Sequence, residues 1–350
     1  MCLVACRPSY SLRGHLVASS FTSNFEMRRF LLVCAGLLGF YAALACVYDC
    51  CVLWLMRHSP SCTATKIERA VKGGEGEAIA IFGSSRALGN YMPSAFSTNA
   101  FNYGVNGMSL NEALILVDQY LQHNSSDPTI IINLDPWGFA DPDTVHLAGD
   151  YRLAARCRSV RDSIPNLSLS WVDWVPVFRF QGQLRKSLTE YLNARKAYTK
   201  KIDNGAELLL NSRTESEWAT IKKGLNPYSF FCDSRCEEQL ESLYEKQGRH
   251  RIVWVVTPTC SAHHALHENP LDMLGFLAHQ THRPKVTVVN LFDMVADFPD
   301  SLFADPTHLN VTGSEKFTQI LKAYLDKDTV VSSNEQSVTG ARILCWSSSW

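Results

Sequence analysis

The chain has two kinds of hydrophobic pattern, one long run near its N-terminus and several short runs further along. Residues 30–48 carry no charge, and after Asp49 a second apolar run covers 50–56. A helix of these nineteen residues spans roughly 28 Å, close to the hydrocarbon thickness of a bilayer. The pattern therefore predicts one transmembrane helix, or signal anchor, within residues 27–57.

The short apolar runs predict buried strands of a parallel sheet. They cover residues 78–82, 129–134, 252–256 and 286–291. Apolar residues recur at helical spacing over residues 109–123, 237–246, 271–279 and 313–325. Strands that alternate with helices are typical of an α/β fold. We predict a doubly wound parallel sheet flanked by helices, with a flavodoxin-like arrangement.

Two of the predicted helices carry start signals. Ser109 stands three residues before Glu112, and Thr312 stands three residues before Glu315. A hydroxyl and a carboxylate at this spacing can accept hydrogen bonds from each other's backbone N–H groups, which forms a capping box. We expect helices to begin directly after Ser109 and Thr312.

The remaining segments divide the chain. Residues 58–77 contain several Ser, Pro and Gly residues and are expected to be a linker with a short helix around 67–71. We expect the α/β domain over 78–326, with a helical insertion at about 140–250 that packs on the sheet, or that forms a lid or groove for an extended substrate. Residues 327–350 show no periodicity and are expected to be unstructured.

The long apolar run leaves more than one interpretation open. Residues 1–26 are an N-terminal segment, and if Met27 is the true start, the run resembles a cleaved signal peptide. The residues that end at Cys46 resemble a lipoprotein cleavage box, but the chain stays apolar after Cys46, which disfavours lipidation. Arg28 and Arg29 precede the run, so the positive-inside rule favours a cytoplasmic N-terminus. We expect a single-pass protein of the cell membrane with an extracytoplasmic (periplasmic) domain.

Composition and charge exclude several classes of protein. Of the 350 residues, 46% are hydrophobic and 19% are charged, which is too apolar for a disordered chain. The 33 basic and 34 acidic residues give a net charge of −1. Without a basic excess to bind phosphates, nucleic acid is not an expected partner. Five of the 12 cysteines lie in or beside the long apolar run, so the cysteines do not form a disulfide framework.

Two polar clusters lie where we expect the carboxyl ends of the parallel strands to form a crevice, one directly after the first predicted strand and one ahead of the helix that Ser109 caps. Ser85 comes after Gly83 and Ser84, so its hydroxyl stands at the opening of the next helix. Taken alone, this is also ordinary turn and N-cap chemistry. Asn106 and Gly107 lie in a glycine-containing loop whose backbone can approach a bound group and donate an N–H to it. Taken alone, this is an ordinary loop.

A third cluster pairs a carboxylate with an imidazole. Asp305 stands three residues before His308, in a turn that contains Pro306. The carboxylate can accept a hydrogen bond from Nδ1–H of the imidazole, which leaves Nε2 to take a proton from a hydroxyl. The alternative interpretation is an Asp-Pro turn with a surface histidine.

In this order and on these elements, the three clusters resemble the sequence blocks of the SGNH (GDSL-type) hydrolase superfamily. The resemblance covers about residues 78–326 and implies an SGNH-like fold. It implies that Ser85 is the nucleophile, His308 the general base and Asp305 its orienting partner. It also implies that the backbone N–H groups of Ser85 and Gly107 belong to an oxyanion hole. Neither a metal nor an organic cofactor is expected.

Two positions depart from the family's pattern. Ser84 stands where the family has Asp, a residue that does not perform the acyl transfer. The family also has an Asn whose side chain donates into the oxyanion hole, whereas Trp137 occupies the matching position here. Asp135, Trp137 and Asn106 are the residues expected to contact substrate beside Gly107. Loss of one oxyanion donor typically costs about 10²- to 10³-fold in rate.

A variant of this kind, anchored by one N-terminal helix, resembles the SGNH-like proteins of bacterial cell-envelope modification. These include relatives of the alginate acetyltransferases and of the teichoic-acid D-alanylation protein. The resemblance implies an acyl-ester hydrolase or O-acyltransferase that acts on an extracytoplasmic glycan or envelope polymer. An acyl donor is then the second substrate, and a multi-pass membrane acyltransferase is an expected partner. The alternative is a catalytically inactive SGNH-fold subunit for glycan binding or assembly, which the missing Asn motivates.

Three further patterns indicate other chemistry more weakly. Cys232 and Cys236 could form a disulfide in an extracytoplasmic domain. A zinc site could be built from the residues after the third predicted strand, Cys260, His263, His264 and His267, although no second cluster complements them. Sequons that matter only in a glycosylating secretory pathway begin at Asn124, Asn166 and Asn310.

Overall fold

The computed structural model describes residues 24–57, 63–96, 99–139, 188, 200–210, 213–334 and 343–344. The helices in these ranges are α1 (Asn24–Arg57), α2 (Thr63–Val71), α3 (Ser85–Asn90), α4 (Leu110–His123), α8 (Glu215–Lys223), α9 (Ser234–Gln247), α10 (Ser261–His264), α11 (Pro270–Gln280) and α12 (Val311–Asn334). The strands are β1 (Ile79–Phe82), β2 (Ala100–Asn102), β3 (Thr129–Leu134), β4 (Lys200–Asp203), β5 (Ala206–Leu209), β6 (Arg251–Val256), β7 (Val286–Asn290) and β8 (Ile343–Leu344). Short 3-10 helices cover Pro93–Ala95 and Asp300–Leu302.

The central sheet is parallel and has the strand order β2-β1-β3-β6-β7-β8. After β2 the chain returns past β1 and builds the sheet in the opposite direction, so the order reverses between β1 and β3. In open α/β sheets, the crevice at such a reversal lies at the carboxyl ends of the strands. The predicted α/β class with a parallel sheet is therefore confirmed. The crevice is expected at the carboxyl ends of β1 and β3, directly after Phe82 and Leu134.

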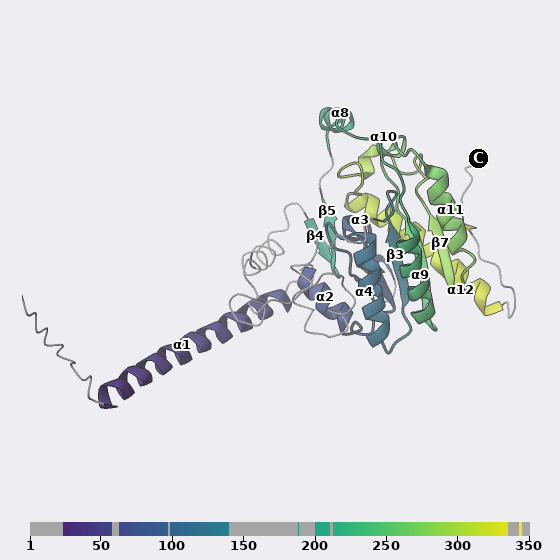
Figure 1. The fold of residues 1–350 in the computed structure, drawn as a ribbon. Coiled ribbons are helices and arrows are strands. Elements are labelled where there is room, and N and C mark those ends of the chain that lie inside the picture. Colours follow the sequence, from purple (N-terminus) through teal and green to yellow (C-terminus); the bar gives the residue numbers. More distant parts are fainter. Residues whose placement is uncertain are drawn as a thin grey trace, which may run out of the picture.

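Strands β1, β3, β6 and β7 are buried on both faces because helices cover the sheet from two sides (Figure 1). In β6, Trp254 packs with residues of α4, α9 and α11, whereas its neighbour Val255 packs with residues of α8 and α12. Side chains alternate between the two faces of a strand, so continuous apolar runs are the expected sequence for a doubly covered sheet. The runs that predicted strands coincide with β1, β3, β6 and β7 to within one residue at each end.

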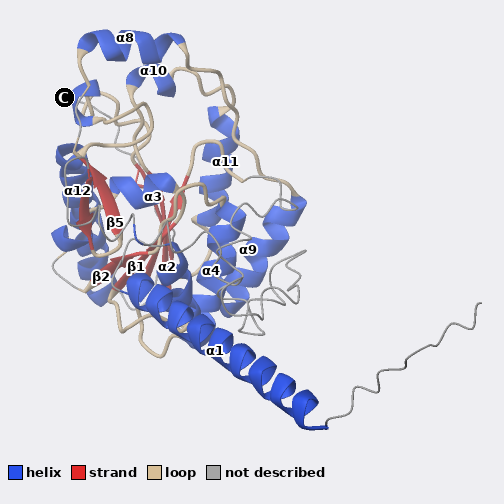
Figure 2. Cartoon of the chain, turned by 90° about the vertical axis from the view of Figure 1, so that its left-hand side faces the viewer, coloured by secondary structure: helices blue, strands red, loops and turns tan. Residues whose placement is uncertain are grey.

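Helix α1 extends away from the α/β domain in both views (Figures 1 and 2). Within it, Met27–Val52 is long and apolar enough to span a membrane by length and composition, and its most apolar window is unburied. Leu32 and Leu38 are each 71% exposed. A soluble core helix would bury such side chains, so their exposure is in keeping with a helix that lipid covers.

The predicted linker is wrong for its second half. Residues 63–71 form α2, in which Ile67 and Ala70 are fully buried in the main hydrophobic core. Glu77, 1% exposed, accepts hydrogen bonds from Arg69 at 2.7 Å and from Tyr103 at 2.8 Å. The polar residues of this segment look like tether residues in the sequence, but they pair with one another inside the domain. The α/β domain therefore begins near Thr63, not at residue 78.

The predicted helical insertion contains a β-hairpin within the described part of the chain. Strands β4 and β5 pair antiparallel around Asn204 and Gly205, whose φ angles are 41° and 87°. Two positive φ angles are what a two-residue type I′ turn requires, and Asn-Gly is its preferred sequence. Lys200 and Lys201, which fall within the predicted helical insertion, are instead the first two residues of β4. Residues 140–187, 189–199 and 211–212 of the insertion lie outside the described part of the chain.

The two predicted helix starts have different outcomes. The capping box of Ser109 and Glu112 is present at the start of α4, as predicted. Helix α12 instead begins at Val311, and the side-chain oxygen of Asn310 accepts a hydrogen bond from the Gly313 N–H at 3.0 Å. An Asn side chain is as good an N-cap as a hydroxyl, and here it precedes the predicted Thr312 cap.

The C-terminal tail also differs from its prediction. Helix α12 continues to Asn334, and β8 pairs in parallel with β7, opposite Val288 and Val289. Two residues are too few for a periodic signal, and β8 is identified only by the neighbouring strand that it pairs with. Residues 335–342 and 345–350 lie outside the described part of the chain.

Candidate active site

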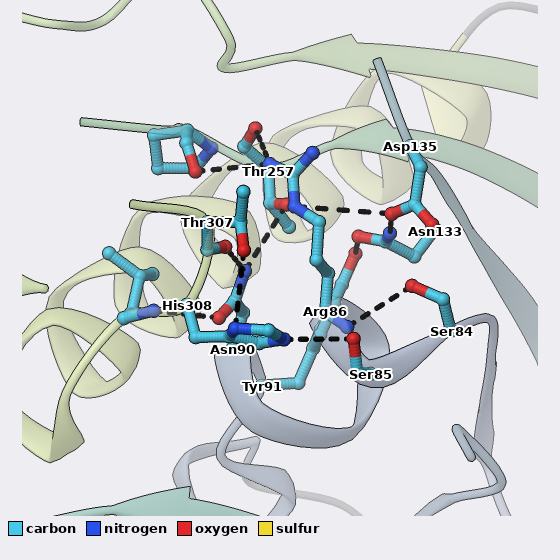
Figure 3. A network of polar contacts seen from close by, with 12 residues as sticks. Ser84, Ser85, Arg86, Asn90, Tyr91, Asn133, Asp135, Thr257, Thr307 and His308 are labelled. Carbon is cyan, nitrogen blue, oxygen red and sulfur yellow. Dashed lines mark hydrogen bonds and ion pairs between the residues drawn. The ribbon is translucent and has the colours of Figure 1, made fainter. Parts of the chain in front are cut away.

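Ser85 occupies a tight turn between β1 and α3. Gly83 has a φ of 145°, and a Cβ there would lie 2.9 Å from the Cβ atoms of both Ala87 and Asn133, so only glycine fits. Ser84 is the N-cap of α3, and its hydroxyl oxygen accepts a hydrogen bond from the Arg86 N–H at 3.1 Å. The turn places Ser85 as the first residue of α3, with its side chain at the carboxyl edge of the sheet and half-buried (Figure 3).

His308 lies directly beside this serine. Its Nε2 is 2.8 Å from Ser85 Oγ, although 223 positions separate the two residues in the chain. Its Nδ1 is 2.8 Å from one carboxylate oxygen of Asp305 and 2.9 Å from the other. A carboxylate only accepts hydrogen bonds, so Nδ1 carries the ring proton and donates a hydrogen bond to Asp305. Nε2 is then left to accept a hydrogen bond from the serine hydroxyl. The predicted juxtaposition of these three side chains is confirmed.

The carboxylate of Asp305 is held in its charged form. Burial alone would raise its pKa, but the hydrogen bond and the charge of His308, together with the backbone N–H groups of Thr307 and His308, outweigh burial and lower the pKa to about 2. Each of those two N–H groups donates to Asp305 Oδ1 at 2.9 Å. Asp305 is therefore a fixed anion that orients the imidazole over the whole physiological pH range.

Behind the serine lies a buried ion pair of Arg86 and Asp135. Arg86 is fully buried, its Nε lies 3.9 Å from Asp135 Oδ1, and its Nη2 donates to the carbonyl of Thr257 at 2.6 Å. Burial lowers the pKa of Arg86, although Asp135 opposes this, and burial raises the pKa of Asp135, although Arg86 opposes that. Asn133 donates to Asp135 at 2.9 Å. Asp135, which was predicted to contact substrate, is instead 5% exposed and serves as the counter-charge of Arg86.

Trp137 is half-buried at the same edge of the sheet. Its ring lies 5.6 Å from the guanidinium carbon of Arg86, and it makes edge contacts with the rings of Tyr228 and His263 at 6.2 and 6.3 Å. Tyr228 and His263 stack at 4.4 Å. Burial and the charge of Arg86 lower the pKa of His263 to about 4, so this imidazole is neutral at pH 7. The three rings form an aromatic surface at this edge of the sheet.

The predicted oxyanion loop follows β2. Asn106 and Gly107 are exposed, and Gly107 has a φ of 78°, as the third residue of a type II turn requires. The Met108 N–H closes this turn by donating to the Val105 carbonyl at 3.2 Å. Val105 in turn donates its N–H to the Gly83 carbonyl at 3.0 Å, which ties the loop to the turn that carries the serine. The role of these N–H groups at an oxyanion stays a prediction.

The four residues considered as a zinc site have different surroundings. Cys260 is buried, His264 contacts Asp293 at 3.0 Å, and His267 stacks on Tyr228 at 5.1 Å. Within the described ranges, no group of three or more His, Cys, Asp or Glu side chains could hold a metal ion. In the described structure these four side chains therefore do not converge on one point.

Two of the three sequon asparagines, Asn124 and Asn310, lie among the described residues. Asn310 is 4% exposed and caps α12, so a glycan could not be attached there. Asn124 donates to the carbonyl of Gly73 at 2.6 Å. Asn166 lies outside the described residues.

A scan against protein-family models finds no match, and a search of the curated proteins finds none either. The chemistry must therefore be argued from the site itself. A hydroxyl, an imidazole and a carboxylate in this hydrogen-bonded order can deprotonate the hydroxyl as it attacks an electrophilic carbon.

Arg86 and Asn90 are the site residues that sequence reasoning missed. Both belong to α3 and are fully buried, and both make hydrogen bonds to loops more than 160 positions away. The only signal in the sequence is that two polar residues follow Ser85 within the six-residue helix α3. Such a residue is far more often solvent-exposed, so burial had to be observed.

Proposed function

We propose that the protein is a membrane-anchored acyl-ester hydrolase or O-acyltransferase with an SGNH-like domain. The observation that carries the proposal is the 2.8 Å contact between Ser85 Oγ and His308 Nε2, with Asp305 on the far nitrogen of the ring. Turn and helix place this group at the strand reversal of the sheet, where α/β proteins bind their ligands.

The proposed reaction has two halves. Ser85 Oγ attacks the ester carbonyl carbon while His308 Nε2 takes the hydroxyl proton, and the ester C–O bond breaks as that proton passes to the leaving oxygen. The product is an acyl-Ser85 intermediate. In the second half His308 Nε2 takes the proton of the acceptor, which attacks the acyl carbon, and the bond from that carbon to Ser85 Oγ breaks as the proton passes to Oγ. Water as acceptor gives hydrolysis, and a sugar hydroxyl gives transfer.

The substrates and location follow from the resemblance and from α1. We propose an extracytoplasmic glycan or envelope polymer as acceptor, with the domain on the periplasmic side of the membrane. A multi-pass membrane acyltransferase would supply or receive the acyl group. Helix α1 supports the anchored arrangement, because a single apolar helix keeps the site close to such a partner.

A fluorophosphonate probe tests the proposal, because it forms a bond only with an activated serine. We expect one adduct on the peptide that contains Ser85, no adduct in Ser85→Ala, and a strongly slowed reaction in His308→Ala. Ser84→Ala is the matched control, since it removes the neighbouring hydroxyl and should still be labelled. A chromogenic acetyl ester with and without an oligosaccharide then separates transfer to sugar from release of free acetate.

A second candidate function is a non-catalytic glycan-binding or assembly subunit. The observation that favours it is Trp137, an aromatic residue at the position where the related family has an amide donor for the oxyanion. Folded wild-type protein that binds an oligosaccharide but takes up no fluorophosphonate would support this candidate and refute the enzyme.

A further inference from the structure

Asn90, the last residue of α3, brackets His308 through its side-chain amide. Its Oδ1 accepts a hydrogen bond from the Leu309 N–H at 2.8 Å, and its Nδ2 lies 3.4 Å from the Thr307 carbonyl, to which it donates. These two groups belong to the peptide bonds directly after and directly before His308. Asn90 is fully buried. One side chain therefore holds the backbone on both sides of the imidazole (Figure 3).

The same short helix carries the nucleophile. Ser85 is the first residue of α3 and Asn90 is the last, so the same short helix carries both side chains. Gly89 lies between them, and a Cβ at Gly89 would stand 3.6 Å from Cδ2 of His308, so the imidazole rests against the backbone of α3. Asn90 Nδ2 also lies 3.3 Å from Oγ1 of Thr257, which follows β6. Asn90 thus contacts both the end of β6 and the histidine loop.

Asp305 and Asn90 restrain different degrees of freedom of His308. The Asp305 carboxylate binds Nδ1 and fixes the rotation of the ring. It does not fix how far the loop stands from α3, because Asp305 is part of that same loop. The bonds from Asn90 to Thr307 and Leu309 set that distance. A reacting pair needs its atoms about 3 Å apart, and an error of 1 Å can cost on the order of 10²-fold in rate.

We propose that Asn90 is a positioning residue that sets the distance between His308 Nε2 and Ser85 Oγ. This inference rests on the proposed function for its effect on rate, but not for its effect on the geometry of His308. Asn90 acts through the backbone of the histidine loop and has no part in the bond-forming steps.

Asn90→Asp is the informative substitution. It preserves the size of the side chain and the oxygen that accepts from Leu309, but it places a second oxygen against the Thr307 carbonyl, where a donor is required. Asn269 offers a matched control, since its Nδ2 donates to the Phe230 carbonyl at 2.9 Å and its Oδ1 accepts from the Phe230 N–H at 2.6 Å. Asn269→Asp removes the same kind of amide donor from a half-buried side chain whose hydrogen bonds go to Phe230 and Asp272.

The experiment uses the full chain in detergent, with three measurements on each variant. These are the unfolding temperature, the kinetics of fluorophosphonate labelling and of chromogenic ester cleavage, and the proton signal of His308 Nδ1–H in protein labelled with ¹⁵N-histidine. For Asn90→Asp we expect 10- to 100-fold slower labelling and lower kcat, an unchanged KM, and a shifted or broadened His308 signal. Asn269→Asp should leave labelling and the His308 signal as in the wild type.

Wild-type labelling and an unchanged His308 signal in folded Asn90→Asp would overturn the inference. If the wild type itself takes up no probe, the proposed function fails, and the His308 signal still decides whether Asn90 positions the ring. If Asn90→Asp does not fold, Asn90→Ser is measured by the same criteria, because it removes both bonds without introducing a charge.

Discussion

The guanidinium of Arg86 and the carboxylate of Asp135 form an ion pair beneath the candidate active site, with Nε 3.9 Å from Oδ1. Arg86 follows the serine turn after β1, and Asp135 follows β3, so the pair joins the two strands on either side of the reversal in strand order. Arg86 also donates to the carbonyl of Thr257 after β6. The residue next to the nucleophile therefore connects the ends of three strands.

Breaking this pair should destabilise the protein strongly. Arg86→Met leaves the Asp135 carboxylate buried without its cation, and Asp135→Asn leaves the Arg86 guanidinium without its anion; each should lower the free energy of unfolding by about 3–5 kcal/mol. The double variant should lose much less than the sum of the two. Urea unfolding followed by tryptophan fluorescence measures these values. Losses that add within about 0.5 kcal/mol would show that the two side chains do not interact.

The low pKa of Asp305 makes stability depend on pH in acid. Its folded pKa of about 2 lies below its ordinary value of 3.8, so its stabilising effect is complete above pH 4 and is lost as the pH falls towards 2. With its partial exposure taken into account, we expect Asp305→Asn to cost about 1–2 kcal/mol at pH 7. The difference from the wild type should shrink between pH 4 and pH 2.5 in urea unfolding. A difference that is constant over this range would contradict the assignment.

Truncation distinguishes a linker from a folded segment at residues 63–77. A chain that starts at Thr63 should fold and unfold cooperatively, because it retains α2 and the buried Ile67. A chain that starts at Ala78 exposes the core surface that α2 covers and lacks Glu77, so the hydroxyls of Tyr103 and Tyr120 lose the carboxylate to which they donate. It should lose cooperative unfolding in thermal denaturation. Equal unfolding temperatures for the two chains would mean that α2 does not contribute to the domain.

Cys232 and Cys236 report on which side of the membrane the domain lies. Their thiols are free and hydrogen-bonded to each other at the start of α9, and Cys236 is buried. Exchange with an oxidised dithiol oxidoreductase would convert the pair to a disulfide, with two protons and two electrons passing to the oxidoreductase. For a periplasmic domain, we expect maleimide-polyethylene glycol to modify these two cysteines in denatured protein only after reduction. Cys232→Ser should expose Cys236 as a single reactive thiol after denaturation, and modification of both without reduction would contradict a periplasmic domain.

Short-range sequence patterns explain both the strands that are predicted correctly and the elements that are predicted wrongly. The apolar runs located β1, β3, β6 and β7 because a doubly covered strand must be apolar along its whole length. Strand β2 was not predicted because three residues carry no period. The hairpin of β4 and β5 had a usable signal in Asn204-Gly205, but the surrounding insertion was interpreted as helical. A short helix at 67–71 is predicted and lies within α2, but the linker interpretation fails because polar residues of α2 are paired inside the protein.

By itself the sequence determined the membrane-length apolar helix, the α/β class, and the three residue types that a serine nucleophile requires. Those features depend on composition and short-range spacing, which a chain carries wherever it folds. Only the tertiary structure decided that Ser85 and His308 lie within hydrogen-bonding distance although 223 positions separate them. It also decided that Asp135 pairs with Arg86, and that Asn90 bonds the backbone on both sides of His308. Burial and long-range pairing select which polar side chains lose water and gain partners, and a linear pattern does not contain that choice.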